Sequence, residues 1–267
     1  MDDLSMSGRL GGAISLTTGY SRKPLQVTGP DGTKRLTLVS GEAFVDGGVA
    51  VTYDRYRIYL NLPVPFSVTG MGGTLGPYQL RAPSVSLATN PDTIADSRIG
   101  FDARLLGQPG SSLRLGVGTQ LIFPTGNRAD YLSDGRYRGM FRFLAAGDSG
   151  GFSYAGQLGV HVRPLNDAPA PGSPHGSEFL FGISAGRRLA VHRNWVVVVG
   201  PEIYGETAFR AFFNGETGTE GLLTARLEGT GTGRNLRVKL GIGHGLIQHF
   251  GAPQWRIVFG VEMFGHK

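Results

Sequence analysis

The chain has 267 residues, of which 44 are Gly and none is Cys. Only 17% of the residues are charged, with a net charge of +6, whereas soluble domains usually carry about a quarter charged residues and about 7% Gly. A 40% apolar content argues against disorder, and the absence of Cys excludes disulfides and thiolate sites. The longest apolar run, Trp195 to Val199, is far shorter than a membrane-spanning helix of roughly 18 residues, and the acidic start Met1-Asp2-Asp3 is unlike a signal peptide.

Alternating hydrophobicity is the main structural signal. From Tyr56 to Val68 every second residue is apolar, and the same period returns at 99–105, 113–123, 152–162 and 255–263. With weaker copies included, the pattern predicts about twelve strands, near 8–20, 41–53, 56–68, 95–106, 111–123, 137–147, 151–163, 177–188, 194–206, 219–229, 234–246 and 254–264. Strands of about 10–13 residues exceed the usual soluble length but suit a tilted strand that crosses a bilayer.

The expected connections alternate between short and long. The short ones are 54–55, 108–110, 148–150, 191–193 and 230–233, and the long ones are 21–40, 69–94, 124–136, 164–176, 207–218 and 247–253. This alternation is typical of bacterial outer-membrane barrels. The sequence therefore predicts an all-β fold: one transmembrane antiparallel β-barrel domain over 1–267, with up-and-down topology, strands from about 8 to 264 and short periplasmic termini. Its expected location is the outer membrane of a Gram-negative bacterium, as a multi-pass protein.

Each predicted strand has an apolar face for lipid and a polar face for the lumen. The lipid-facing candidates are Ile58, Leu60, Leu62, Val64, Phe101, Leu115, Val117, Leu158, Val160, Val197, Ile257 and Phe259. The lumen-lining candidates are Arg57, Arg98, Asp102, Arg104, Arg114, Arg142, Glu202, Arg226, Arg237, Lys239, Arg256 and Glu262. Twelve bases and eight acids are expected in the lumen in total, an excess of four positive charges.

Two interpretations of this lumen stay open. Surplus arginines could line a porin-like pore that passes small, preferentially anionic solutes. Alternatively, acids and bases could pair into a network that closes the barrel, leaving an envelope-anchoring or surface-adhesion protein that acts through its extracellular loops. The apolar loop 69–94 could bind a partner or fold into the lumen. The expected surroundings are the lipid bilayer and lipopolysaccharide. Nucleic acid is not an expected partner, because the bases alternate singly instead of clustering on one face.

Enzymatic and metal chemistry find little support in the sequence. His175-Gly176-Ser177 has the H-x-S arrangement of some lipolytic barrels, but it lies in a flexible, Pro-rich segment without an evident orienting residue. His192, His244, His249 and His266 show no metal-ligand spacing. We therefore expect no enzymatic activity, no metal site and no cofactor.

Four short segments resemble a known family when taken together. They are Gly100 to Gly107, Leu121 to Asn127, Glu178 to Gly182 and Gly200 to Gly205. They resemble the barrel domains of OmpA-type outer-membrane proteins from myxobacteria and related groups. In that family a peptidoglycan-binding domain often follows the barrel, so the resemblance implies a possible peptidoglycan link through a domain that this chain lacks.

Overall fold

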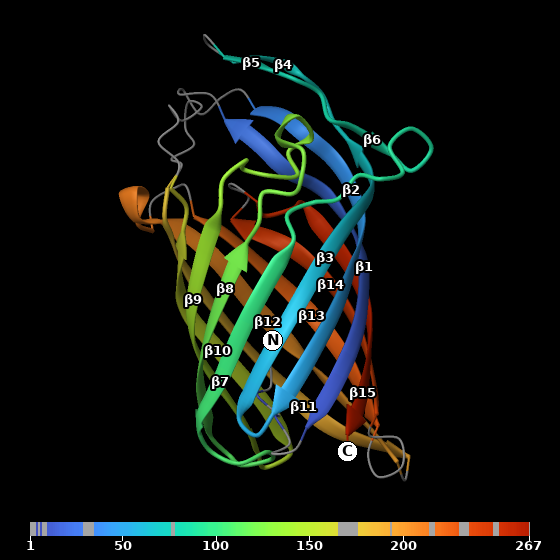
Figure 1. The fold of residues 1–267 in the computed structure, drawn as a ribbon, viewed down its shortest axis with the longest axis vertical. Coiled ribbons are helices and arrows are strands. Elements are labelled where there is room, and N and C mark those ends of the chain that lie inside the picture. Colours follow the sequence, from blue (N-terminus) through green and yellow to red (C-terminus); the bar gives the residue numbers. More distant parts are fainter. Residues whose placement is uncertain are drawn as a thin grey trace.

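The computed structural model describes residues 4, 6, 10–28, 35–75, 78–164, 176–192, 194–213, 217–229, 235–247 and 251–266. Twelve long strands form a closed antiparallel barrel, in which each strand pairs with its neighbours in the chain and β1 pairs with β15 (Figure 1). The strands are β1 (Gly11–Thr28), β2 (Arg35–Tyr53), β3 (Tyr56–Thr69), β7 (Arg98–Leu106), β8 (Arg114–Ile122), β9 (Arg138–Ser149), β10 (Phe152–Val162), β11 (Glu178–His192), β12 (Trp195–Ala208), β13 (Gly218–Gly229), β14 (Leu236–Ile247) and β15 (Trp255–His266). The predicted all-β barrel with up-and-down order is confirmed.

Short turns gather at one end of the barrel, which we call the short-turn end, and the other end is the long-loop end (Figure 1). Residues 54–55 join β2 to β3, as predicted. The turn between β9 and β10 is centred on Gly150 and Gly151, one residue later than expected. Both glycines have positive φ, as a two-residue turn between twisted strands requires.

The expected loop 21–40 is wrong, because β1 continues to Thr28 and β2 already begins at Arg35. This extension carries apolar residues that were expected to lie in a loop. Val27 and Leu38 are buried against Leu75 of β4 (Gly73–Leu75). β4 pairs with β5 (Tyr78–Leu80), and this hairpin covers the extension of β1 and β2. The apolar side chains of the hairpin and of the extension are therefore buried against each other.

A second cluster joins the other parts of the long-loop end. Val39, Val68, Val85 and Leu132 are buried together, with Val85 on β6 (Ser84–Ser86) and Leu132 just after the 3-10 turn η1 (Arg128–Asp130). Next to Leu132, the Tyr131 hydroxyl donates a hydrogen bond to the Arg81 carbonyl at 2.7 Å, and burial raises the pKa of that hydroxyl. Loop 69–94 thus packs against other segments of the long-loop end.

A bulge in the β2–β3 pairing changes which face β3 presents. Ala43 pairs with Ser67, whereas Phe44 pairs with Pro65, so Phe66 is the extra residue. The alternation reverses beyond a bulge, because two residues on one strand oppose one on the other. Val68, which strict alternation puts on the lipid side, is therefore only 2% exposed.

The outer wall is apolar. Ile14, Val51, Ile58, Leu158 and Phe143 each expose more than half of their surface. A continuous band of this kind is costly in water and matches the lipid-facing surface of membrane barrels. Among the described residues, no helix is long and apolar enough to cross a membrane.

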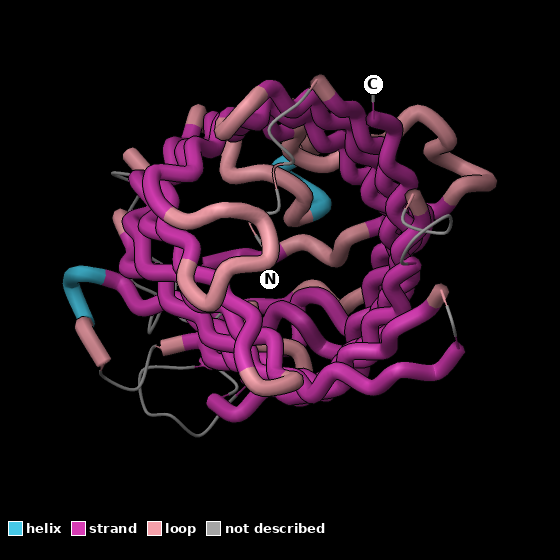
Figure 2. The backbone as a smooth tube through the Cα atoms, turned by 90° about the horizontal axis from the view of Figure 1, so that it is seen from below, coloured by secondary structure: helices cyan, strands magenta, loops and turns pink. Residues whose placement is uncertain are grey.

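Two described residues before β1, Leu4 and Met6, lie inside the barrel instead of beyond its rim. Leu4 and Met6 are almost fully buried and pack against Leu144 and Ala146 of β9. Arg104 Nη1 donates hydrogen bonds to the carbonyls of Met6, at 2.7 Å, and Leu4, at 3.5 Å. Viewed from the short-turn end, the strands form a closed ring around the lumen (Figure 2).

Candidate functional site

The inner surface of the barrel is the candidate site, because its charged side chains are brought together from strands far apart in the sequence. Asp102 on β7 is at the centre of one cluster and has no exposed surface. Its carboxylate is ion-paired with Arg57 of β3 and, at 3.3 Å, with Arg142 of β9. Arg142 also donates to the Tyr59 hydroxyl at 2.8 Å. One buried acid on β7 thus pairs with two arginines, one from β3 and one from β9.

Gly118 on β8 makes this cluster possible. A Cβ at this position would overlap Asp102 Oδ1 and would lie 3.4 Å from Arg142 Nη2. The missing side chain leaves room for the charged groups of the neighbouring strands. This is one physical reason for the high Gly content.

Two smaller clusters lie nearer the long-loop end. Arg98 of β7 pairs with Asp46 of β2, which also accepts a hydrogen bond from Asn61 at 3.1 Å. On the opposite side, Arg256 of β15 lies 3.5 Å from Glu220 of β13. The Tyr204 hydroxyl accepts from Arg256 at 3.1 Å and donates to Glu220 at 2.7 Å.

The largest network lies near the short-turn end and spans β8 to β15. Asp148 pairs with Arg114 at 2.9 Å and with Arg188 at 3.0 Å. Glu228 pairs with Arg226 at 2.7 Å and with Arg237 at 3.3 Å. Glu262 completes the chain of contacts by pairing with Arg237 and Lys239. These pairs reduce the cost of holding so many charges inside the barrel.

The predicted surplus of four positive charges in the lumen is too large. Asp148, Glu206 and Glu220 also lie on the inner face, where they contact Arg114, His161 and Arg256 respectively. Eleven acids on or beside the strands therefore meet the twelve expected bases. Asp148 falls in an expected turn, whereas Glu206 and Glu220 lie near the ends of their strands but in phase with Glu202 and Arg226, so alternation was sufficient to place them inside.

The structure leaves a cavity of about 340 Å³ within the half of the barrel near the short-turn end. Its charged lining consists of five bases and three acids, which are Arg114, Arg188, Arg226, Arg237, Lys239, Asp148, Glu202 and Glu228. Apolar walls come from residues such as Leu222 and Val258. Positive charge is therefore in excess at this place although the lumen is nearly balanced.

The other predicted residues are placed as follows. Arg104 is 5% exposed and binds the N-terminal segment instead of an acid. Glu202 accepts a hydrogen bond from Thr224 at 3.0 Å. Of the lipid-facing candidates, Leu60, Leu62, Phe101, Ile257 and Phe259 expose between 39% and 46% of their surface. Leu115, Val117, Val160 and Val197 are half-buried.

The H-x-S motif lies only partly within the described residues. His175 lies outside the described residues, and the Ser177 hydroxyl oxygen accepts the backbone N–H of Arg163 at 3.4 Å. A different histidine, His161, lies beside Glu178 and Glu206 at the long-loop end. No local sequence signal predicts this group, because its members come from three different strands.

Comparisons with known proteins support the fold. No family model matches this sequence, and no curated protein matches it. Among solved structures, an outer-membrane channel from Pseudomonas putida F1 is similar with a TM-score of 0.55 and 13% identity, covering 97% of this chain and 96% of that one. The NanC porin is similar with a TM-score of 0.54 and 6% identity, covering 95% and 99%. These likenesses are to channel and porin barrels, and the OmpA-type assignment is not confirmed.

Proposed function

We propose that this protein is a porin-like outer-membrane barrel that passes small solutes through a narrow, charged lumen. The single observation that supports this most is the cavity of about 340 Å³, lined by ion-paired but accessible charges, inside a barrel with an apolar outer wall. The same barrel fold occurs in a channel and in a porin. The apolar wall further supports a location in the outer membrane of a Gram-negative bacterium, with the bilayer as its surroundings.

Anion preference is part of the proposal and depends on where the charges lie. Selectivity is determined by the narrow part of a pore, because a solute passes closest to the wall there. The cavity carries five bases against three acids, so its field favours small anions. No catalytic step is part of the proposal.

Conductance measurements test both parts of the proposal. The refolded protein is inserted into planar bilayers, and the reversal potential is measured across a salt gradient. We expect stable steps with anion preference. Lys239→Gln should lower that preference and Glu228→Gln should raise it, because each removes one charge of the cavity wall. Arg187→Gln, on the exposed outer side of β11, is the matched control and should change neither.

Conductance steps with the same ion selectivity in the wild type and in both cavity variants would contradict a solute pathway through the cavity. Silence from correctly folded protein would favour the second candidate function, a closed barrel that anchors the envelope or acts through its outer loops. A specific observation supports that candidate: Leu4 and Met6 occupy the lumen and pack against β9.

A further inference from the structure

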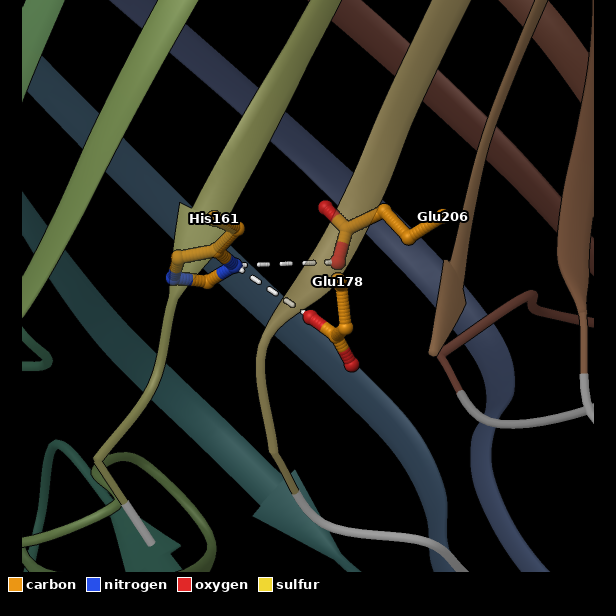
Figure 3. A group of neighbouring side chains, drawn as sticks. All are labelled: His161, Glu178 and Glu206. Atoms are coloured by element: carbon orange, nitrogen blue, oxygen red, sulfur yellow. Dashed lines mark ion pairs between the residues drawn. The ribbon is translucent and has the colours of Figure 1, made fainter. Parts of the chain in front are cut away.

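Three side chains of neighbouring strands converge at the long-loop end of the barrel (Figure 3). His161 is near the end of β10, Glu178 begins β11, and Glu206 lies near the end of β12. His161 and Glu178 are direct cross-strand partners, and Glu206 pairs with Leu180, two residues further along β11. The three strands therefore hold the three side chains on one inner face.

The distances suit a shared cation. His161 Nδ1 lies 3.3 Å from Glu178 Oε2 and 3.9 Å from Glu206 Oε2, and all three ligand atoms lie within 4.8 Å of one another. Ligands of a tetrahedral Zn²⁺ at about 2.1 Å from the ion are about 3.4 Å apart. Small side-chain rotations would bring the three atoms to that spacing.

The buried atoms lack the hydrogen bonds that a purely structural role would provide. His161 is 5% exposed, yet within the described part of the chain neither of its ring nitrogens makes a hydrogen bond. Glu178 Oε2 also has none, so the 3.3 Å contact is not aligned as one. Buried polar atoms normally have a hydrogen-bond partner, and those that have none can be ligands of an ion.

The charges around the group are also unbalanced. Glu178 Oε1 accepts from Arg163 at 2.9 Å, which orients the carboxylate and leaves Oε2 free to bind. Arg163 also pairs with Asp134, which pairs with Arg138, and Arg138 pairs with Asp96. With neutral His161, these contacts and Glu206 bring together four acids and two arginines. The surplus of two negative charges equals the charge of one divalent ion.

We propose that His161 Nδ1, Glu178 Oε2 and Glu206 Oε2 bind a divalent transition-metal ion, with Zn²⁺ as the probe. One imidazole and two carboxylates are a donor set that suits Zn²⁺. Glu206 exposes about half of its side chain, so an ion can enter and its fourth position can hold water. The bound ion would link β10, β11 and β12 where long loops follow.

Calorimetric titration of the chelator-treated, detergent-folded protein with Zn²⁺ tests the site. We expect one ion per chain, with affinity reduced at least tenfold in His161→Gln and in Glu206→Gln. His244→Gln is the matched control, because this histidine lies exposed on the outer face of β14, and its binding should equal that of the wild type. Zn²⁺ should also raise the unfolding temperature of the wild type and of His244→Gln only.

Folding of each variant is checked by heat-modifiable migration. If His161→Gln does not fold, Glu206→Gln tests the site instead, because the Glu206 side chain is half exposed and its replacement should not prevent folding. Absence of stoichiometric binding would mean that the group is an ion pair only and would overturn the proposal. Equal binding by the wild type and Glu206→Gln would overturn it as well. Neither outcome depends on whether the barrel conducts.

Discussion

Replacement of Asp102 by Asn should destabilise the barrel more than any other neutralisation of a single lumen acid. The substitution keeps the shape of the side chain but removes a charge that pairs with both Arg57 and Arg142. Removing one partner of a buried ion pair costs about 3–5 kcal/mol, because the remaining charge stays desolvated. Here the two arginine side chains are 21% and 17% exposed, so water offsets part of the penalty. We expect a loss of about 3 kcal/mol.

The measurement is equilibrium unfolding in urea of the protein folded in lipid vesicles, followed by the fluorescence of its two Trp residues. Asp54→Asn is the matched control. Asp54 pairs with Arg55 at 3.3 Å in a turn where both side chains are about half exposed, so its loss should cost less than about 0.5 kcal/mol. If the free energy of unfolding of Asp102→Asn lies within about 0.5 kcal/mol of the wild-type value, the loss equals that of an exposed ion pair. The buried ion pairs of Asp102 would then not stabilise the barrel.

Three further predictions concern the walls and the inserted segment. Leu60→Arg and Phe259→Arg put a charge on the outer face and should each lower the free energy of unfolding by about 2–4 kcal/mol near the bilayer midplane. Heat-modifiable folding equal to that of the wild type would contradict the assignment of these residues to the lipid-facing side. Gly118→Ala should displace the Asp102 carboxylate and be non-additive with Asp102→Asn in a double-mutant cycle, whereas Gly139→Ala meets open space and should be neutral in the same unfolding assay. Arg104→Ala removes the hydrogen bonds to the Leu4 and Met6 carbonyls and should raise single-channel conductance; an unchanged conductance would mean that these bonds do not restrict the path.

Strand period predicted much of the fold because the two faces of a barrel wall meet different solvents. Where both neighbours of a strand are regular, as along Ile58 to Leu62, the period alone indicates the outer face. It fails at Val68, because a bulge depends on the pairing of two strands and not on one segment. It also fails over 21–40, where apolar residues are buried by the β4–β5 hairpin, a contact that the sequence of neither segment indicates.

The candidate site was less predictable than the wall. Arg57 and Arg142 could be placed inside by alternation, but their shared partner Asp102 depends on the register of three strands. Asp148 falls in an expected turn, whereas Glu206 and Glu220 keep the alternation of Glu202 and Arg226, which would have placed them inside. The group formed by His161, Glu178 and Glu206 has no local signal, because the spacing between its members follows from loop lengths that carry no chemistry.

Leu4 and Met6 also brace the barrel across its interior. They precede β1 in the chain but pack against Leu144 and Ala146 of β9, and β1 and β9 are not neighbours in the sheet. Arg104 of β7 adds hydrogen bonds to their carbonyl oxygens. The first described residues are thus an inner tie between parts of the wall that no backbone ladder joins directly.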